Sequence, residues 1–172
     1  MSEPETQGFQ RDDFCFACGQ QNGNGLRLQP TASEGRAVVH WTPPPHYQGY
    51  AGVLHGGVIA TLLDEAMAHA ALSLVGGAPT AELSLQFLKP VMTGRELEVR
   101  AEVRERKRRI LVVGAELIQD GEVRARGEGK FLVVAPRARS SGPGLLELHG
   151  HPRNGTFRLS TEGCGTPPSP PQ

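Results

Sequence analysis

The sequence predicts an α+β fold in which one long helix packs on one face of a single curved antiparallel sheet. Residues 52–75 have the length and apolar content of a buried helix. Apolar residues then alternate with polar ones through most of residues 80–134, which is the period of a strand. Short connections between these segments favour an antiparallel meander. A chain of 172 residues has the size of one domain with tails rather than of two domains.

The elements before the helix are expected to be short. The stretch "GLRLQPTASEGRAVVHW", residues 25–41, contains two alternating segments joined by a Ser-Glu-Gly turn. The Pro-rich stretch "TPPPHYQGYAG", residues 42–52, predicts a loop that leads into the helix. Gly76 and Gly77 are predicted to close the helix.

Four successive strands are expected after the helix, in residues 80–90, 95–109, 110–118 and 122–134. The first of them places Ala81, Leu83, Leu85 and Phe87 on one face. Thr93-Gly94 separates the first two strands, and Asp120-Gly121 is a strong hairpin turn signal between the last two.

The composition changes sharply at both ends of the predicted domain. Residues 136–172 are rich in Gly, Pro, Ser and Arg, with too few apolar residues to offset the entropy of ordering, so we expect a disordered tail. Residues 1–13 are polar and predict a short N-terminal tail. The folded domain is therefore expected to span residues 14–135.

Charge and cysteine usage exclude several classes of protein. The 18 basic and 18 acidic residues balance, so the overall charge indicates neither a nucleic-acid nor a membrane partner. The polar, acidic start is unlike a signal peptide, which predicts a cytoplasmic protein. Three cysteines are too few for a disulfide framework. Cys15 and Cys18 have the spacing of half a zinc site, but no second pair follows, and we expect a reduced, partly buried turn without a metal.

The helix is predicted to present three different faces. The broad apolar face that packs on the sheet contains Val58, Ile59, Leu62, Leu63, Ala66, Met67, Ala70 and Leu74. On a second stripe, Glu65 and His69 are spaced to pair as surface residues. Asp64 lies on a third stripe with Ala60, Ala68, Ala71 and Val75. It is either an ordinary solvated acid or part of a face that another backbone, subunit or ligand approaches.

The helix begins at His55-Gly56-Gly57, which allows two interpretations. Unpaired N–H groups and partial positive charge at a helix start can polarise a carbonyl oxygen, and a glycine lets that oxygen come close. Alternatively, the two glycines make a tight turn into the helix, and His55 holds the loop by a hydrogen bond.

The segment "HGGVIATLLDEA", residues 55–66, resembles the hotdog-fold acyl-CoA thioesterases of the 4-hydroxybenzoyl-CoA thioesterase superfamily, in particular the phenylacetate-degradation (PaaI) type. That signature has HGG followed by an acid nine residues after the His, which is Asp64 here. "YQGYAGVLHGG", "FLKPVMTGRELEVRAEV" and "CFACGQQNGNGLRL" are also similar to this family, so the resemblance covers residues 14–134. It implies a hotdog fold and a homodimer or dimer of dimers with active sites at the interface. It also implies hydrolysis of an acyl-CoA thioester to free acid and CoA without a cofactor.

The resemblance also implies roles for individual residues. The N–H of Gly57, or else of Gly56, would polarise the thioester carbonyl, Asp64 would act as general base or nucleophile, and His55 would orient the loop. Thr80 fits a hydroxyl that holds the water, although a plain strand-start threonine fits equally well. Relatives place an Asn where this chain has Gly49, so that helper is absent or replaced by Gln48.

Further candidate substrate-binding residues are Glu65 and a basic cluster made of Arg104, Arg106, Lys107, Arg108 and Arg109. The cluster is either a solvated turn that protects a sheet edge or an electrostatic site for the phosphates of coenzyme A. Two alternative functions stay open at this point. One is a non-catalytic acyl-CoA-binding protein of the same fold, and the other is an acyl-thioester hydratase or dehydratase.

Overall fold

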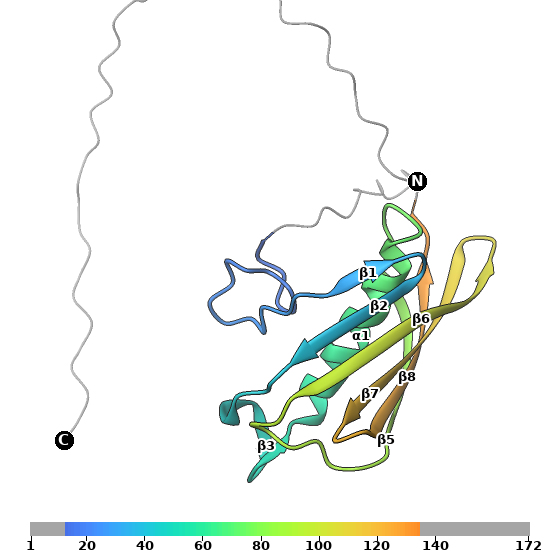
Figure 1. The fold of residues 1–172 in the computed structure, drawn as a ribbon. Helices are drawn as coiled ribbons and strands as arrows, with labels where there is room; N and C mark the ends of the chain where they lie inside the picture. Colours follow the sequence, from blue (N-terminus) through green and yellow to red (C-terminus); the bar gives the residue numbers. More distant parts are fainter. Residues whose placement is uncertain (1–12, 135–172) are drawn as a thin grey trace, which may run out of the picture. The chain divides into compact units, whose positions relative to one another are not determined.

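The computed structural model describes residues 13–134, and the predicted tails lie almost entirely outside this range. Helix α1 (Gly56–Leu72) crosses one face of a six-stranded antiparallel sheet, which confirms the predicted α+β class (Figure 1). The strands of this sheet are β1 (Thr31–Ser33), β2 (Arg36–Trp41), β5 (Thr80–Phe87), β6 (Leu97–Lys107), β7 (Ile110–Gln119) and β8 (Glu122–Leu132). Within the described residues, no helix combines the length and apolarity needed to cross a membrane.

The predicted Pro-rich loop has more structure than expected. It contains the 3-10 turn η1 (Pro45–Tyr47) and a small hairpin of β3 (Gln48–Tyr50) and β4 (Val53–Leu54). This hairpin leads directly to His55 and therefore fixes where α1 begins.

The order of strands in the sheet is β1-β2-β6-β7-β8-β5, which corrects the expected meander of four successive strands. β6, β7 and β8 do follow one another, but β5 pairs with β8 and lies at the far edge. The segment 88–96 carries the chain from that edge to β6, where β6 pairs with β2. The segment 88–96 is long enough to pass β7 and β8, which lie between β5 and β6 in the sheet. Short connections along the chain therefore did not predict which strands are neighbours.

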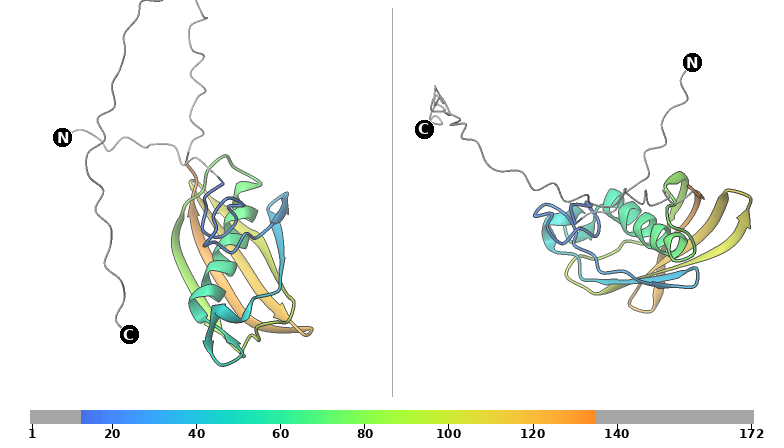
Figure 2. Two further views of the ribbon diagram at one scale, coloured as in Figure 1. Left: turned by 90° about the vertical axis from the view of Figure 1, so that its left-hand side faces the viewer. Right: turned by 90° about the horizontal axis from the view of Figure 1, so that it is seen from above.

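The sheet curves around α1, so that the helix lies on its concave face (Figure 2). The core between them is formed by buried apolar side chains that include Val39, Leu62, Leu63, Met67, Val99, Leu111, Val113, Leu117 and Phe131. Gly127 of β8 permits the close approach of helix and sheet. A Cβ atom at this position would lie 2.9 Å from Leu85 Cδ2 and 3.3 Å from Met67 Cε.

Two hairpin turns agree with the prediction. Asp120 and Gly121 have φ values of 54° and 75°, and Glu34 and Gly35 have φ values of 50° and 79°. Two consecutive residues in the left-handed region form the tight turns that match the twist of antiparallel strands. These local signals were therefore sufficient to place the β7–β8 and β1–β2 turns.

The end of α1 differs from the prediction, because the helix stops at Leu72 and not at the glycine pair. The Ser73 hydroxyl donates to the Ala70 carbonyl at 2.7 Å and accepts from the Gly35 N–H at 2.7 Å. A serine that bonds to the backbone in this way competes with further helical hydrogen bonds. Leu74, predicted to belong to the core face, is consequently 44% exposed.

Gln119 at the end of β7 ties the sheet to the segment that follows β5. Its side chain is buried, accepts from the Met92 N–H at 2.7 Å, and donates to the carbonyls of Met92 and Arg95 at 3.0 and 3.2 Å. This amide adds to the backbone hydrogen bonds that the same segment makes with Arg124 of β8 and Leu54 of β4.

Candidate active site

The start of α1 is capped by the His55 side chain. Its Nδ1 atom accepts from the Gly57 N–H at 2.9 Å, and the His55 N–H donates to the Tyr47 carbonyl at 2.9 Å. His55 thus joins the 3-10 turn to the helix. The Gly57 N–H, predicted to polarise a carbonyl, is already engaged in this conformation.

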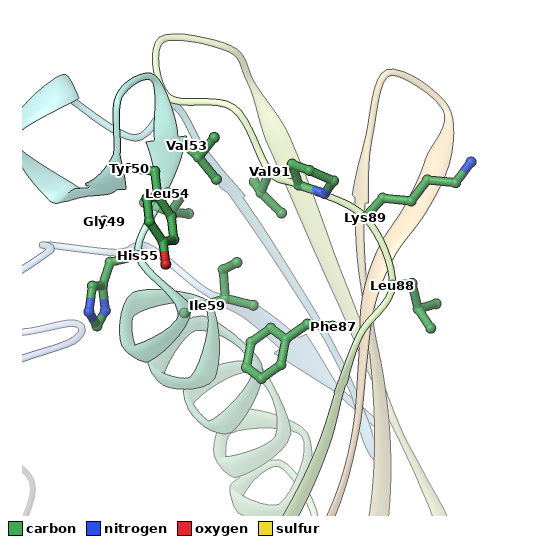
Figure 3. A pocket seen from close by; sticks show the side chains of 12 residues that line it. Gly49, Tyr50, Val53, Leu54, His55, Ile59, Phe87, Leu88, Lys89 and Val91 are labelled. Atoms are coloured by element: carbon green, nitrogen blue, oxygen red, sulfur yellow. The ribbon is translucent and has the colours of Figure 1, made fainter.

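A cavity of about 670 Å³ opens beside the helix start. Its walls are mainly apolar and come from β3, β4, α1 and the residues around the end of β5. Ile59 lies between Tyr50 and Phe87, while the Lys89 ammonium group points away (Figure 3). Tyr50, Phe87 and Leu88 are 83%, 56% and 48% exposed, so much of this apolar wall is uncovered in a single chain.

Gly56 lines this cavity, whereas Gly57 does not. Among the described residues, no acceptor for the Gly56 N–H is found. A Cβ atom on Gly56 would make ordinary van der Waals contact with the ring of Phe87, at 3.7 Å. The geometry therefore favours Gly56 over Gly57 as the donor to a bound carbonyl.

Asp64 lies further along α1 and contacts the first residue of β5. The Thr80 hydroxyl donates to Asp64 Oδ1 at 2.8 Å, which brings these two predicted residues together. Burial raises the pKa of Asp64 above the usual range of an aspartate, the hydrogen bond from Thr80 lowers it, and the neighbouring charge of Glu65 raises it. Since burial is the largest of these effects, the carboxylate is a stronger base than a solvated one.

The acid and the cavity of the same chain lie apart. Asp64 follows Gly56 by eight residues, or about 12 Å of helix, and it does not line the cavity. One chain alone therefore has an apolar cavity with a backbone N–H donor at one place and a basic carboxylate at another.

Strand β5 connects these two places along an uncovered edge of the sheet. Asp64 contacts its first residue, and Phe87 at its end forms part of the cavity wall. Every residue of β5 except Leu85 is exposed, including the apolar Leu83. Of the four residues on the predicted apolar face of this strand, only Leu85 is partly buried.

Gln48 is not brought into the cavity. Its Oε1 atom accepts from the Gly52 N–H at 3.0 Å, which braces the β3–β4 turn. Gly49 does line the cavity, and a Cβ atom there would lie 3.1 Å from Cδ2 of His55. An Asn side chain at position 49 would thus meet the imidazole that caps the helix.

Glu65 is also away from the cavity, and it is not the surface residue that was predicted. Its carboxylate pairs with His69 Nε2 at 2.9 Å as expected, but the two side chains are only 13% and 11% exposed. The N-terminal segment 13–28 packs over this stripe of the helix and brings Cys15 and Cys18 beside Glu65. A helical pattern alone cannot reveal such a cover, because the covering residues lie far away in sequence.

The basic cluster lies at the β6–β7 hairpin, at the end of the molecule opposite the helix start (Figure 1). Its five side chains are exposed. Arg104 pairs with Glu128 and Lys107 with Glu105, while among the described residues Arg106 and Arg108 have no ion-pair partner. Within one chain the cluster and the cavity are therefore separate.

Several residues of the cavity wall were not predicted from the sequence: Tyr50, Val53, Ile59, Leu88 and Val91. They belong to separate segments that only the fold brings together. The stretches "YQGYAGVLHGG" and "FLKP", which resemble the thioesterase family, contain most of them and were the one available signal.

Comparison with known proteins gives a consistent result. Residues 51–125 match the model of the thioesterase superfamily. Acyl-coenzyme A thioesterase THEM4 of Xenopus laevis is 37% identical over 62 residues, and that of Bos taurus is 27% identical over 131 residues. These matches cover 36% and 73% of this chain, but the chain spans only 28% and 54% of those relatives.

Solved structures with the same fold include a conserved protein of Pseudomonas aeruginosa, with a TM-score of 0.58 and 32% identity over 63% of this chain and 90% of that one. The PaaI protein of the E. coli phenylacetic acid degradation operon has a TM-score of 0.59 and 27% identity over 64% of this chain and 81% of that one. The family match begins before α1 and ends in β8, so it includes His55, Asp64 and Thr80.

Proposed function

The chain belongs to the thioesterase superfamily and has the hotdog fold of its PaaI-type members, so we propose that it hydrolyses acyl-CoA thioesters to a free acid and CoA. The observation that carries this proposal is the Asp64–Thr80 pair at the start of the uncovered edge strand, which ends at the cavity lined by Gly56. A base, a hydroxyl and a backbone donor are the groups that thioester hydrolysis requires.

In the proposed reaction, the Gly56 N–H at the positive end of α1 stabilises the developing oxyanion. Asp64, held by Thr80, removes a proton from the attacking water, or attacks the carbonyl carbon itself. The carbon–sulfur bond then breaks and CoA leaves as a thiolate, which needs little help from a general acid. If Asp64 was the nucleophile, water then hydrolyses the mixed anhydride, which releases the free acid and restores the carboxylate. Exclusion of water from the apolar cavity strengthens each of these interactions.

We further propose that a complete site needs two copies of the chain. Two β5 edges that pair antiparallel around a two-fold axis place the Thr80 end of one strand beside the Phe87 end of the other. Asp64 of one copy then faces the cavity of its partner. The same pairing covers the exposed apolar residues Leu83 and Phe87 and removes an open sheet edge.

In such a dimer, the β6–β7 hairpin of one copy lies at the same end as the cavity of its partner. The basic cluster is then on the side from which the phosphates of CoA enter. Arg106 and Arg108, which have no ion-pair partner among the described residues, are the side chains best able to bind phosphate.

The test is release of free thiol from a panel of aryl, short-chain and long-chain acyl-CoAs. We expect wild type to release CoA from at least one of them, and Asp64→Asn to lose a factor of about 100 or more in kcat/KM. The matched control is Glu96→Gln, which neutralises an exposed acid and should leave the rate unchanged.

Two other outcomes would replace the proposal. Binding of acyl-CoA without thiol release by wild type would indicate a non-catalytic binding protein. Loss of enoyl-CoA absorbance without thiol release would indicate a hydratase.

A further inference from the structure

The N-terminal segment brings two cysteines to a partly buried acid of α1, Glu65, which follows Asp64 directly. One ligand atom each from Cys15, Cys18 and Glu65 lies within 4.8 Å of the other two. All three residues are partly buried. Glu65 is separated from the cysteines by 47 and 50 positions in sequence, so it is the fold that gathers them.

This donor set is one that zinc prefers. Two cysteines separated by two residues are the commonest half of a zinc site, and zinc accepts carboxylate oxygen as a further ligand. Ligand atoms around a tetrahedral zinc are about 3.3–3.8 Å apart, given metal–ligand distances of about 2.0–2.3 Å. Small side-chain rotations bring atoms that lie within 4.8 Å to this separation.

The backbone around the cysteines is a tight, fixed turn. The Gly19 N–H donates to the Cys15 carbonyl at 2.9 Å. A Cβ atom at Gly19 would lie 2.4 Å from the Asp13 oxygen and 2.5 Å from the Cys15 nitrogen, so only glycine fits directly after Cys18. Leu26 and Leu28 extend this arrangement, because their N–H groups donate to Phe16 and Ala17 at 2.9 Å each. The two sulfur atoms are therefore presented by a preformed loop.

Glu65 lies beside the two sulfur atoms with most of its side chain out of contact with water. A carboxylate with a side chain only 13% exposed loses most of its hydration, and thiolates beside it would add repulsion. His69 supplies one contact at 2.9 Å. A divalent cation would offset two of the three negative charges that these ligands carry when ionised.

We propose that Cys15, Cys18 and Glu65 bind one divalent cation. The chemistry of these ligands identifies the cation as zinc. His69 is a positioning residue, because its ring nitrogen holds the Glu65 carboxylate in the direction of the cysteines. A water molecule completes the four ligands that zinc takes. This ion ties the N-terminal segment to α1 one residue after Asp64, and the inference does not depend on thioester hydrolysis.

The first experiment measures metal in the full-length protein purified without chelators. We expect about one zinc per chain, removal by a chelator, and rebinding with a dissociation constant of the order of nanomolar or tighter. Cys15→Ser, Cys18→Ser and Glu65→Gln should each lose the metal or bind it at least tenfold more weakly. The matched control is Cys164→Ser, the third cysteine, which should keep the full amount.

The second experiment begins with thiol protection in the wild-type chain, which a folding defect of a variant cannot obscure. A thiol reagent should modify three cysteines in the metal-free chain, and added Zn²⁺ should protect two of them. Co²⁺ bound in place of zinc should show a sulfur-to-cobalt charge-transfer band. His69→Gln should keep this band while the affinity falls by about 10–100-fold, which separates positioning from ligation.

Three results would overturn the proposal. The first is a wild-type chain whose thiols react alike with and without Zn²⁺. The second is metal that survives in the Cys15→Ser and Cys18→Ser variants, because it must then be bound elsewhere. The third is loss of metal in Cys164→Ser, which would assign the ligand to a different part of the chain.

Discussion

At the scale of single residues, the Asp64–Thr80 hydrogen bond determines how the acid is presented. Burial raises the pKa of Asp64, and the Thr80 hydroxyl partly opposes this by stabilising the charged form. The same bond fixes the carboxylate at the start of β5. Removal of the hydroxyl would therefore leave a base that is less often ionised and less well oriented.

We expect Thr80→Val to lower kcat/KM for the best acyl-CoA substrate by about 10–100-fold. This factor corresponds to the free energy that a hydrogen bond to a charged group contributes. Thr80→Ser keeps a hydroxyl and should recover most of the activity. Steady-state thiol release from both variants checks this, with the exposed Thr31→Val as the matched control. Equal rates for Thr80→Val and wild type would mean that the threonine is an ordinary strand-start residue.

At the scale of elements, one buried amide adds to the backbone hydrogen bonds that hold the segment between β5 and β6. Gln119 makes three hydrogen bonds to the backbone of Met92 and Arg95, just beyond the part of this segment that forms the cavity wall. A buried polar group that loses its partner costs more than the bond itself contributes. This one side chain thus links the stability of the sheet to the shape of the cavity.

Gln119→Leu should lower the free energy of unfolding by about 1–3 kcal/mol, because the backbone groups of Met92 and Arg95 lose a buried partner. Urea denaturation at a fixed protein concentration measures this change. Gln29→Leu, at an exposed position, should shift the free energy by less than about 0.5 kcal/mol. Similar values for the two variants would contradict the assigned role of Gln119.

Elements whose signals are local could be predicted, and those that depend on distant residues could not. The helix, the β6–β7–β8 meander and the Asp120-Gly121 turn follow from periodicity and turn chemistry. The β5–β8 pairing and the burial of Glu65 require contacts between remote segments. For the site, the resemblance singled out Asp64 and Thr80, but the contact between them needed the fold.

At the scale of the whole molecule, the division of the site between two copies can be tested by complementation. Asp64→Ala removes the acid, and Gly56→Phe places a large side chain in the cavity wall, where a Cβ atom would already contact the Phe87 ring at 3.7 Å. In a mixed dimer, the acid of the Gly56→Phe chain meets the open cavity of the Asp64→Ala chain. One complete site therefore forms from two inactive chains.

We expect an equal, randomly exchanged mixture of these variants to recover about a quarter of wild-type activity, since half the dimers are mixed and each has one working site. Thiol release before and after subunit exchange measures this recovery. Circular dichroism and size-exclusion chromatography verify that each variant is a folded dimer. A mixture as inactive as its components would mean that each chain supplies its own acid.

The pairing of β2 with β6 has a consequence for how the chain folds during synthesis. Arg36 lies opposite Glu102, so the first long strand leaves the ribosome well before the strand that it must join. The β6–β7–β8 meander closes through two tight turns and can form as soon as it has emerged, whereas β2 must wait for it. The order of synthesis therefore exposes the apolar face of α1 early, and it is covered only when the last third of the domain has been made.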